Sequence, residues 1–301
     1  MNEEKPIDQV RRMLAGLISP DMPFMERRAQ AEKFAQAFVA PEGIAIAPGE
    51  LGGVGVEWIV PAGAAERPVL LHLHGGGYVL GNPAGSRPFT TAFALKSEAR
   101  VASVDYRLAP EHPFPAAVED AVKAYRALLA EGYRGADIAI GGESAGGGLA
   151  LATLLALRHE RVELPACAFA VSPWADMTCT AASFDGCAGR DPMLTRRALK
   201  EMADAYLAGT SAWHPFASPL YGDLAGLPPL LVHVGSDEVL LDDARAIHAA
   251  ARLSGVHCTL GIYRGMIHVW HMFHPVLPEA DRAIAEIAAF AAAHWRRQWA
   301  G

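Results

Sequence analysis

Short apolar runs alternate with helical patterns along most of the chain. From position 54 onward, most runs are rich in Val, Ile and Leu, and Gly or Pro follows them. The runs that predict strands lie at 54–60, 69–73, 101–104, 138–140, 166–171, 230–234 and 258–262. Continuous apolar runs are typical of strands that are buried on both faces. The pattern therefore predicts an α/β fold with a mostly parallel central sheet flanked by helices.

Helical periodicity fills the intervals between these runs. The predicted helices lie at 87–98, 116–131, 145–159, 242–253 and 279–297. Segment 174–229 departs from the alternation, because it carries no strand signal. It contains a Gly-rich loop at 183–189 and a helix at 195–208, which Thr195 would cap. We expect this segment to be an insertion over the ligand-binding edge of the sheet.

The first forty residues predict two amphipathic helices separated by a break at 19–21. Apolar residues recur at helical spacing on both sides of the break. They are Val10, Met13, Leu14 and Leu17 before it, and Ala31, Phe34 and Phe38 after it. No repeat or low-complexity linker divides the chain, so a single folding unit with additions is expected.

The composition favours a folded protein and disfavours several partners. Hydrophobic residues make up 51% of the 301 positions and charged residues 20%, so enough apolar surface can be buried to offset conformational entropy. The net charge of −7 argues against nucleic-acid binding, which needs clustered Lys and Arg.

Compartment signals point to the cytoplasm. The start of the chain has glutamates where a signal peptide needs basic residues and an apolar run. The most apolar tract, 283–295, is too short to span a bilayer. The four cysteines lack metal-ligand spacing and are too sparse for a disulfide scaffold. We expect a cytoplasmic location without a membrane span.

The sequence G-E-S-A-G at 142–146 lies between a predicted strand and the helix that follows it. Small residues there permit the sharp turn that presents a nucleophilic Ser144 hydroxyl. The alternatives are a plain Gly-rich turn or a phosphate cradle, and the absence of G-x-x-x-x-G-K-[ST] weakens the second. A second signal is H-G-G-G at 74–77, because successive glycines let backbone N–H groups face a developing negative charge.

A serine nucleophile needs a histidine base and an acid. In α/β folds that carry a nucleophilic serine at such a turn, the three residues occur along the chain in the order Ser, Asp/Glu, His. His268 lies in the loop after the last predicted strand, at the edge where ligands bind. His233, in a strand, and His248, in a helix, are interpreted as structural. His271 and His274 share a three-residue spacing with His268, but no carboxylate lies nearby, so a metal site is disfavoured.

The acid is predicted to end the strand at 230–234. Four carboxylates occur in the following loop, and Asp242 and Asp243 are suited to capping the next helix. Asp237 and Glu238 both remain candidates on position alone.

These residues resemble the hormone-sensitive-lipase-like family of bacterial esterases within the α/β-hydrolases. The resemblance rests on the stretches at 74–78, 105–116 (D-Y-R-L-A-P-E-H-P-F-P-A) and 142–147, and on the acid and histidine loops. The second stretch is the most specific. The likeness spans about residues 50–300, and the helical N-terminus resembles the cap of that family. It implies a cap at 1–45 and a catalytic domain at 46–301, with 183–215 contributing to the cap.

The resemblance implies a role for each matching residue. Ser144 would be the nucleophile and His268 the general base and acid, with the N–H groups of Gly76, Gly77 and Ala145 as oxyanion hole. The family's acid motif, Asp-x-Leu-x-Asp, fits 238–242 with Glu in first place. It therefore favours Glu238 over Asp237. Glu143 also stands where relatives usually have Asp.

The implied function is a serine carboxylesterase acting on short- to medium-chain carboxylic esters through an acyl-enzyme, without cofactor or metal. A lactone hydrolase or an acetyl hydrolase of the same mechanism is the alternative, and a non-catalytic small-molecule receptor on this fold is a further one. The expected partner is a small ester or lactone, and relatives suggest a homodimer. The predicted apolar acyl pocket is formed by Met13, Leu14, Leu17, Met25, Phe34, Phe38, Trp213 and Phe216.

Overall fold

An eight-stranded sheet, in the order β1-β2-β4-β3-β5-β6-β7-β8, forms the centre of the protein. The structure is a computed structural model and describes residues 5–17, 22–36, 38–66 and 68–296. The strands are β1 (Ile44–Leu51), β2 (Val54–Pro61), β3 (Val69–Leu73), β4 (Arg100–Val104), β5 (Ile138–Glu143), β6 (Cys167–Val171), β7 (Leu230–Gly235) and β8 (Cys258–Tyr263). Strands β4, β3 and β5 to β8 run parallel, while β2 is antiparallel to both β1 and β4. The predicted α/β fold is confirmed.

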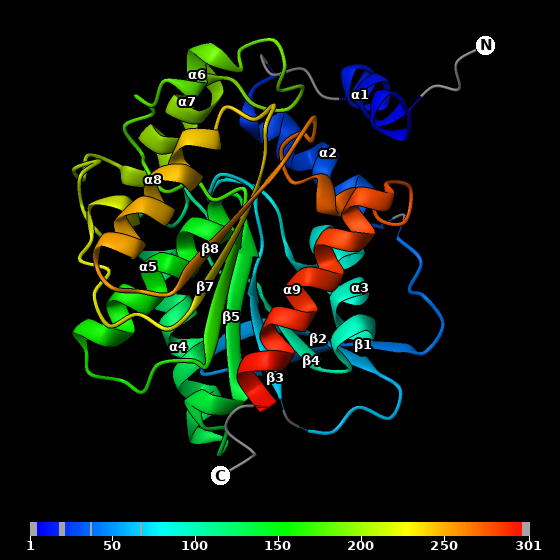
Figure 1. Cartoon of the computed structure of the whole chain (residues 1–301), viewed down its shortest axis with the longest axis vertical. Helices are drawn as coiled ribbons and strands as arrows, with labels where there is room; N and C mark the ends of the chain where they lie inside the picture. The colour runs from blue at the N-terminus through cyan, green and yellow to red at the C-terminus, as the bar shows by residue number, and fades with distance from the viewer. Residues whose placement is uncertain (1–4, 18–21, 37, 67, 297–301) are drawn as a thin grey trace.

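Helices cover both faces of the sheet (Figure 1). One face carries α3 (Arg87–Ser97) and α9 (Pro278–Arg296), and the other carries α4 (Ala116–Ala130), α5 (Ala145–His159) and α8 (Leu241–Leu253). Every residue of β3, β5, β6 and β7 is buried between these layers, which explains their unbroken apolar runs. These helices agree with the predicted ranges within one or two residues.

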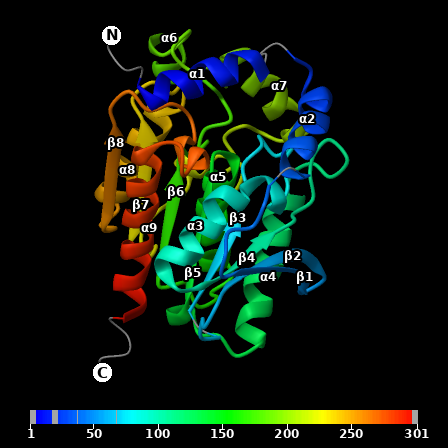
Figure 2. The same cartoon turned by 90° about the vertical axis from the view of Figure 1, so that its right-hand side faces the viewer.

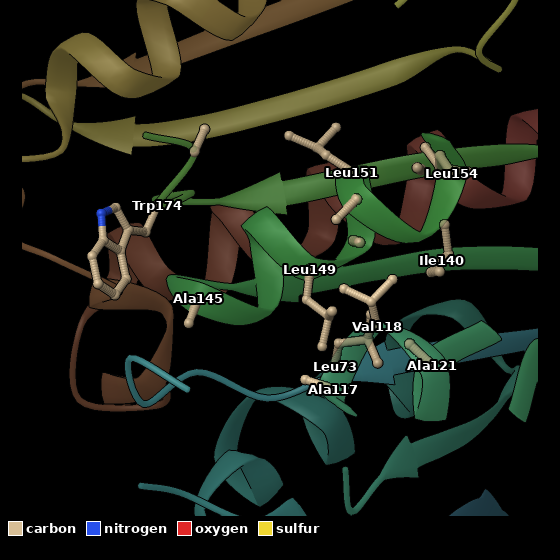
Figure 3. Packing of buried hydrophobic residues seen from close by; sticks show 14 of the residues in the cluster. Leu73, Ala117, Val118, Ala121, Ile140, Ala145, Leu149, Leu151, Leu154 and Trp174 are labelled. Atoms are coloured by element: carbon tan, nitrogen blue, oxygen red, sulfur yellow. The ribbon is translucent and has the colours of Figure 1, made fainter. Parts of the chain in front are cut away.

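Helix α5 is the element that the site depends on most. Leu149 on this helix packs with Leu73 of β3, Ile140 of β5 and Val118 of α4 (Figure 3). The buried contacts fix the start of α5 against the carboxyl ends of the central strands. A residue at that start is therefore held by the core on both sides.

A group of helices lies over the carboxyl edge of the sheet, as Figures 1 and 2 show. They are α1 (Pro6–Leu17), α2 (Phe24–Gln36), α6 (Ser183–Gly186) and α7 (Arg196–Leu207). The Thr195 hydroxyl caps α7 by accepting from the N–H of Ala198, as predicted. The predicted loop at 183–189 instead begins with α6, in which Ser183 and Phe184 are buried. Short 3-10 turns at Pro83–Ser86, Gly135–Asp137, Pro219–Tyr221 and Trp270–Phe273 complete the connections.

Strand β1 was not predicted. Its residues alternate only weakly between buried and exposed, and it contains Pro48 and Gly49, which disfavour strand structure. An edge strand tolerates proline because one of its sides has no strand partner. Residue 45, the predicted end of the cap, lies inside this strand.

No helix within the described residues combines the length and the apolar character needed to cross a lipid bilayer. All four cysteines are buried and unbonded to one another.

Candidate active site

Ser144 stands at a sharp turn between β5 and α5. Its φ of 57° and ψ of −121° are strained for a residue with a side chain. The turn passes close to β3, and a Cβ on Gly146 or Gly142 would lie 1.9 Å or 2.1 Å from the carbonyl oxygen of Leu73. The two glycines are therefore required by space, and they allow the hydroxyl to project above the sheet.

His268 links Ser144 to an acid. Its Nε2 lies 2.9 Å from the Ser144 hydroxyl oxygen, and its Nδ1 lies 2.9 Å from Glu238 Oε2. A carboxylate only accepts hydrogen bonds, so Nδ1 carries the proton and Nε2 accepts from the hydroxyl. This arrangement leaves Nε2 ready to take the serine proton.

Glu238 is fully buried, and its second oxygen is also occupied. Oε1 accepts from the Ser172 hydroxyl at 2.8 Å and from the N–H of Gly235. Burial raises the pKa of Glu238, while the bonds from His268 and Gly235 act in the opposite direction. With Oε1 held by two donors, Oε2 is directed at the imidazole.

Asp237, the competing acid, pairs with two arginines. Its carboxylate accepts from Arg11 Nη2 at 2.7 Å and pairs with Arg190 at 3.5 Å. Arg11 also donates to the carbonyl of Gly265, three residues before His268. Asp237 therefore joins α1 to the acid and histidine loops.

The prediction that Asp242 and Asp243 cap a helix is wrong. Helix α8 begins after Leu240 without a side-chain cap. Asp242 accepts from the N–H of Ser183, and Asp243 accepts from the N–H groups of Ala175 and Asp176. These carboxylates serve the segments after β6, which need acceptors because their N–H groups are buried.

The glycine loop after β3 lies beside Ser144. Gly76 and Gly77 have φ values of 124° and 61°, and a Cβ at Gly76 would lie 2.0 Å from the carbonyl oxygen of Leu80. A cavity of about 220 Å³ is lined by Gly75, Gly76 and Gly77 together with Ser144 and His268. Ala145 opens α5, so its N–H lacks an intrahelical acceptor.

Glu143 holds this loop, a role that sequence reasoning missed. Its Oε1 accepts from the N–H of Gly75 at 2.9 Å and from the Ser86 hydroxyl at 2.6 Å. Its Oε2 lies 2.7 Å from Nε2 of buried His72, whose Nδ1 lies 2.9 Å from the Ser103 hydroxyl. Burial by itself would raise the pKa of Glu143, but His72, Ser86 and Gly75 outweigh it and the pKa falls to about 2.

Tyr106 supports the same loop from the family-specific stretch at 105–116. Its hydroxyl donates to the carbonyl of His74 at 2.7 Å, and the two rings stack with centroids 4.1 Å apart. The stretch therefore contributes by packing and hydrogen bonding, outside the cavity.

The cavity wall comes from different residues than predicted. Its apolar part is formed by Leu80, Met193, Leu194, Leu199, Met202 and Met272, and α2 contributes Arg27 and Ala31. Met13, Met25 and Trp213 are about half exposed or more, and Leu14 packs beneath the histidine loop. Phe216 packs near His159 and His214, and Phe38 does not line the cavity. The side chains of Leu17 and Phe34 lie outside the described part of the structure.

The other histidines do not converge with His268. His271 turns toward His233, with Nε2 and Nδ1 3.3 Å apart, and His274 lies 3.2 Å from Asp281. Within residues 5–296, apart from the gaps given above, no group of three or more His, Cys, Asp or Glu residues is arranged to hold a metal ion. A larger hollow of about 770 Å³ adjoins Pro61, Leu95 and Trp295 and contains none of the residues around Ser144.

The chain is similar to known proteins over most of its length. The family described as the alpha/beta hydrolase fold matches residues 70–272. An acetyl-hydrolase of Streptomyces hygroscopicus is 47% identical over 267 residues, which is 88% of each chain. An esterase of Acinetobacter venetianus is 39% identical over 249 residues, or 82% of each chain.

Similar solved structures indicate the family within this fold. The crystal structure of an esterase from the bacterial hormone-sensitive lipase family is 43% identical and superposes with a TM-score of 0.94, covering 98% of this chain and 100% of that one. The esterase EstE5, soaked with p-nitrophenyl butyrate, is 44% identical with a TM-score of 0.93, covering 97% and 99%. The chain belongs to the hormone-sensitive-lipase-like esterases of the α/β-hydrolase superfamily. It is a carboxylic ester hydrolase.

Proposed function

We propose that the chain cleaves short- to medium-chain carboxylic esters through a covalent acyl-enzyme formed on Ser144. The observation that carries this proposal is the hydrogen-bonded series Ser144, His268 and Glu238, with the hydroxyl opening into a cavity. A strained serine beside a correctly oriented imidazole is the arrangement that activates an alcohol as a nucleophile.

The first half of the reaction forms the acyl-enzyme. His268 Nε2 takes the Ser144 proton while the serine oxygen attacks the ester carbonyl carbon. The N–H groups of Gly76, Gly77 and Ala145 donate to the carbonyl oxygen as it becomes negative, each contributing about 3 kcal/mol of transition-state stabilisation. His268 then gives its proton to the departing alkoxide, and the alcohol leaves.

The second half releases the acid by the same groups. Water enters, loses a proton to His268 and attacks the acyl carbon, and the N–H groups again hold the oxyanion. Collapse of this intermediate returns the proton to Ser144. The chain, the ester and one water supply every proton and electron pair in these steps.

The cap belongs to the same proposal. Residues 1–45 and 183–215 form a cap over a catalytic domain at 46–301, although β1 starts at Ile44. Supporting this division, Arg27 of α2 and Met202 of α7 both line the cavity. Because the cavity is small and mostly apolar, it suits short and medium acyl chains better than long ones.

The relatives support one narrower alternative. The Streptomyces hygroscopicus protein is named an acetyl-hydrolase, so an acetylated substrate is the second candidate. A lactone would need the same steps. The homodimer, the cytoplasmic location and the lack of nucleic-acid binding remain predictions from sequence.

An ester panel tests the proposal. Purified protein should hydrolyse p-nitrophenyl acetate, butyrate and hexanoate, with kcat/KM falling for longer acyl chains. Ser144→Ala should lower kcat by about three decades or more, because no other group supplies the nucleophile. γ-Butyrolactone, assayed beside the esters, tests the lactone alternative. An N-acetyl amide shows whether acetyl groups on nitrogen are also removed. Equal rates of hydrolysis by Ser144→Ala and by the unmodified protein would refute the proposal. If both rates also equalled the rate in buffer without protein, the result would favour a non-catalytic receptor.

A further inference from the structure

A cation lines the same cavity, and one of its buried nitrogens has no acceptor among the described residues. Arg27, on α2, is one of the residues around the space above Ser144. Its Nη2 donates to the carbonyl of Met193 over 3.3 Å, which is long for a hydrogen bond. Its Nη1 is buried without a hydrogen-bond partner among the residues that the structure describes. Burial lowers the pKa of this guanidinium.

The adjacent arginine shows what a structural role looks like here. Arg28 donates to the carbonyls of Val79 and Ala109 at 2.7 Å and 2.8 Å, and it pairs with Glu111 at 2.7 Å. The guanidinium of Arg28 therefore holds α2 against the loops that contain Val79 and Ala109. Among the described residues, the side chain of Arg27, one residue earlier, has only the long bond to the carbonyl of Met193.

Among the described residues that line the cavity, no carboxylate is free to pair with Arg27. Glu143 also lines the cavity, but His72, Ser86 and the N–H of Gly75 occupy both of its oxygens. Burying a charge without a partner destabilises the fold. Unpaired buried charges are typical of ligand-binding sites, where the ligand provides the partner. The apolar part of the wall is largely methionine and leucine, and Arg27 is the one Lys or Arg among the described residues that line the cavity.

We propose that Arg27 binds an anionic oxygen group, such as a carboxylate, carried by the ester substrate. This inference rests on the proposed ester hydrolysis at Ser144 and names the substrate class: an ester that has an apolar stretch between its carbonyl and a negatively charged group. A guanidinium suits this role because it offers two parallel N–H donors to a carboxylate. The charged group can belong to the acyl part or to the alcohol part of the ester.

Matched anionic and neutral esters test both sources. For the acyl side, the p-nitrophenyl monoesters of succinic, glutaric and adipic acid are compared with the neutral butyrate, valerate and hexanoate. For the alcohol side, the acetate ester of 4-hydroxybutyrate is compared with butyl acetate by acid release. The measured quantity is the ratio of kcat/KM for the anionic ester to that for its neutral partner.

Arg27→Met should lower this ratio about tenfold to hundredfold in one of the two arms, because a hydrogen bond to a charged group is lost. Arg27→Lys should keep part of the ratio, because the positive charge remains while the parallel pair of N–H donors is lost. Lys33→Met is the matched control, since Lys33 is exposed on the same helix and its loss should change the ratio less than about twofold. Comparing ratios within one variant removes any effect of misfolding.

The outcomes separate this inference from the proposed function. If neutral esters are hydrolysed in a Ser144-dependent manner but the ratio is unchanged by Arg27→Met in both arms, the role of Arg27 is refuted alone. If Lys33→Met lowers the ratio as much, the preference comes from general surface charge and the inference is also refuted. If no ester is hydrolysed in a Ser144-dependent manner, the proposed function itself fails.

Discussion

Glu238→Gln should lower kcat for p-nitrophenyl butyrate by about three to four decades, whereas Asp237→Asn should lower it by less than about tenfold. The reason lies in what each side chain contacts. Glu238 accepts from Nδ1 of His268, and an amide can present its N–H₂ there and favour the wrong imidazole tautomer. Asp237 contacts Arg11 of α1 and Arg190. Its loss should therefore weaken the attachment of α1 and leave the imidazole of His268 in place.

The pair of variants is closely matched, because both replace one acid by its amide in neighbouring positions of one loop. Unfolding midpoints of both variants should be measured, since each loses buried or half-buried hydrogen bonds. A conservative variant, Glu238→Asp, should retain more activity than Glu238→Gln, because an aspartate still offers a carboxylate to Nδ1 of His268, although from a shorter side chain. If Asp237→Asn loses three decades and Glu238→Gln does not, the assignment of the acid is wrong.

Glu143→Gln should lower kcat about tenfold to hundredfold with little change in KM. Glu143 is a positioning residue: it holds the N–H of Gly75 and thereby sets the glycine loop, without reaching the ester itself. A displaced loop weakens donors that act on the oxyanion, which exists only beyond the ground state. The loss should therefore fall on kcat.

The pH dependence distinguishes this role from an effect on the base. The pKa of Glu143 is about 2, so the carboxylate is charged throughout the assay range. The ratio of kcat between the unmodified protein and Glu143→Gln should then stay constant between about pH 6 and pH 9. Glu143→Asp should recover activity if a negative charge at this position is what holds the loop. A loss confined to KM, or a ratio that changes with pH, would contradict the positioning role.

Local patterns in the sequence were sufficient to predict that Ser144 and His268 lie together in the candidate site. Ser144 lies inside a short motif whose glycines are required by the approach of Leu73, so the sequence carries the constraint directly. His268 could be chosen because it follows the last strand, and strand ends share one edge of a parallel sheet. The buried strands were predictable because both faces are covered, while β1, at the edge, has no such pattern.

Contacts between distant positions were not predictable in this way. Spacing alone could not separate Asp237 from Glu238, because Asp237 pairs with Arg11, far away in the sequence. The bond between His72 and Glu143 depends on how β3 and β5 pair. The cavity wall depends on how α2 and α7 pack over the sheet, and helical periodicity does not specify which face of each helix turns inward.

Detecting the acyl-enzyme is the most direct test of covalent catalysis by Ser144. The protein should be mixed with p-nitrophenyl acetate, quenched in acid within the first turnover and analysed by intact-mass and peptide mass spectrometry. We expect one acetyl group per chain on the peptide that contains Ser144, and none on Ser144→Ala. An acetyl group on another residue, or ester hydrolysis by Ser144→Ala at the rate of the unmodified protein, would contradict catalysis through Ser144.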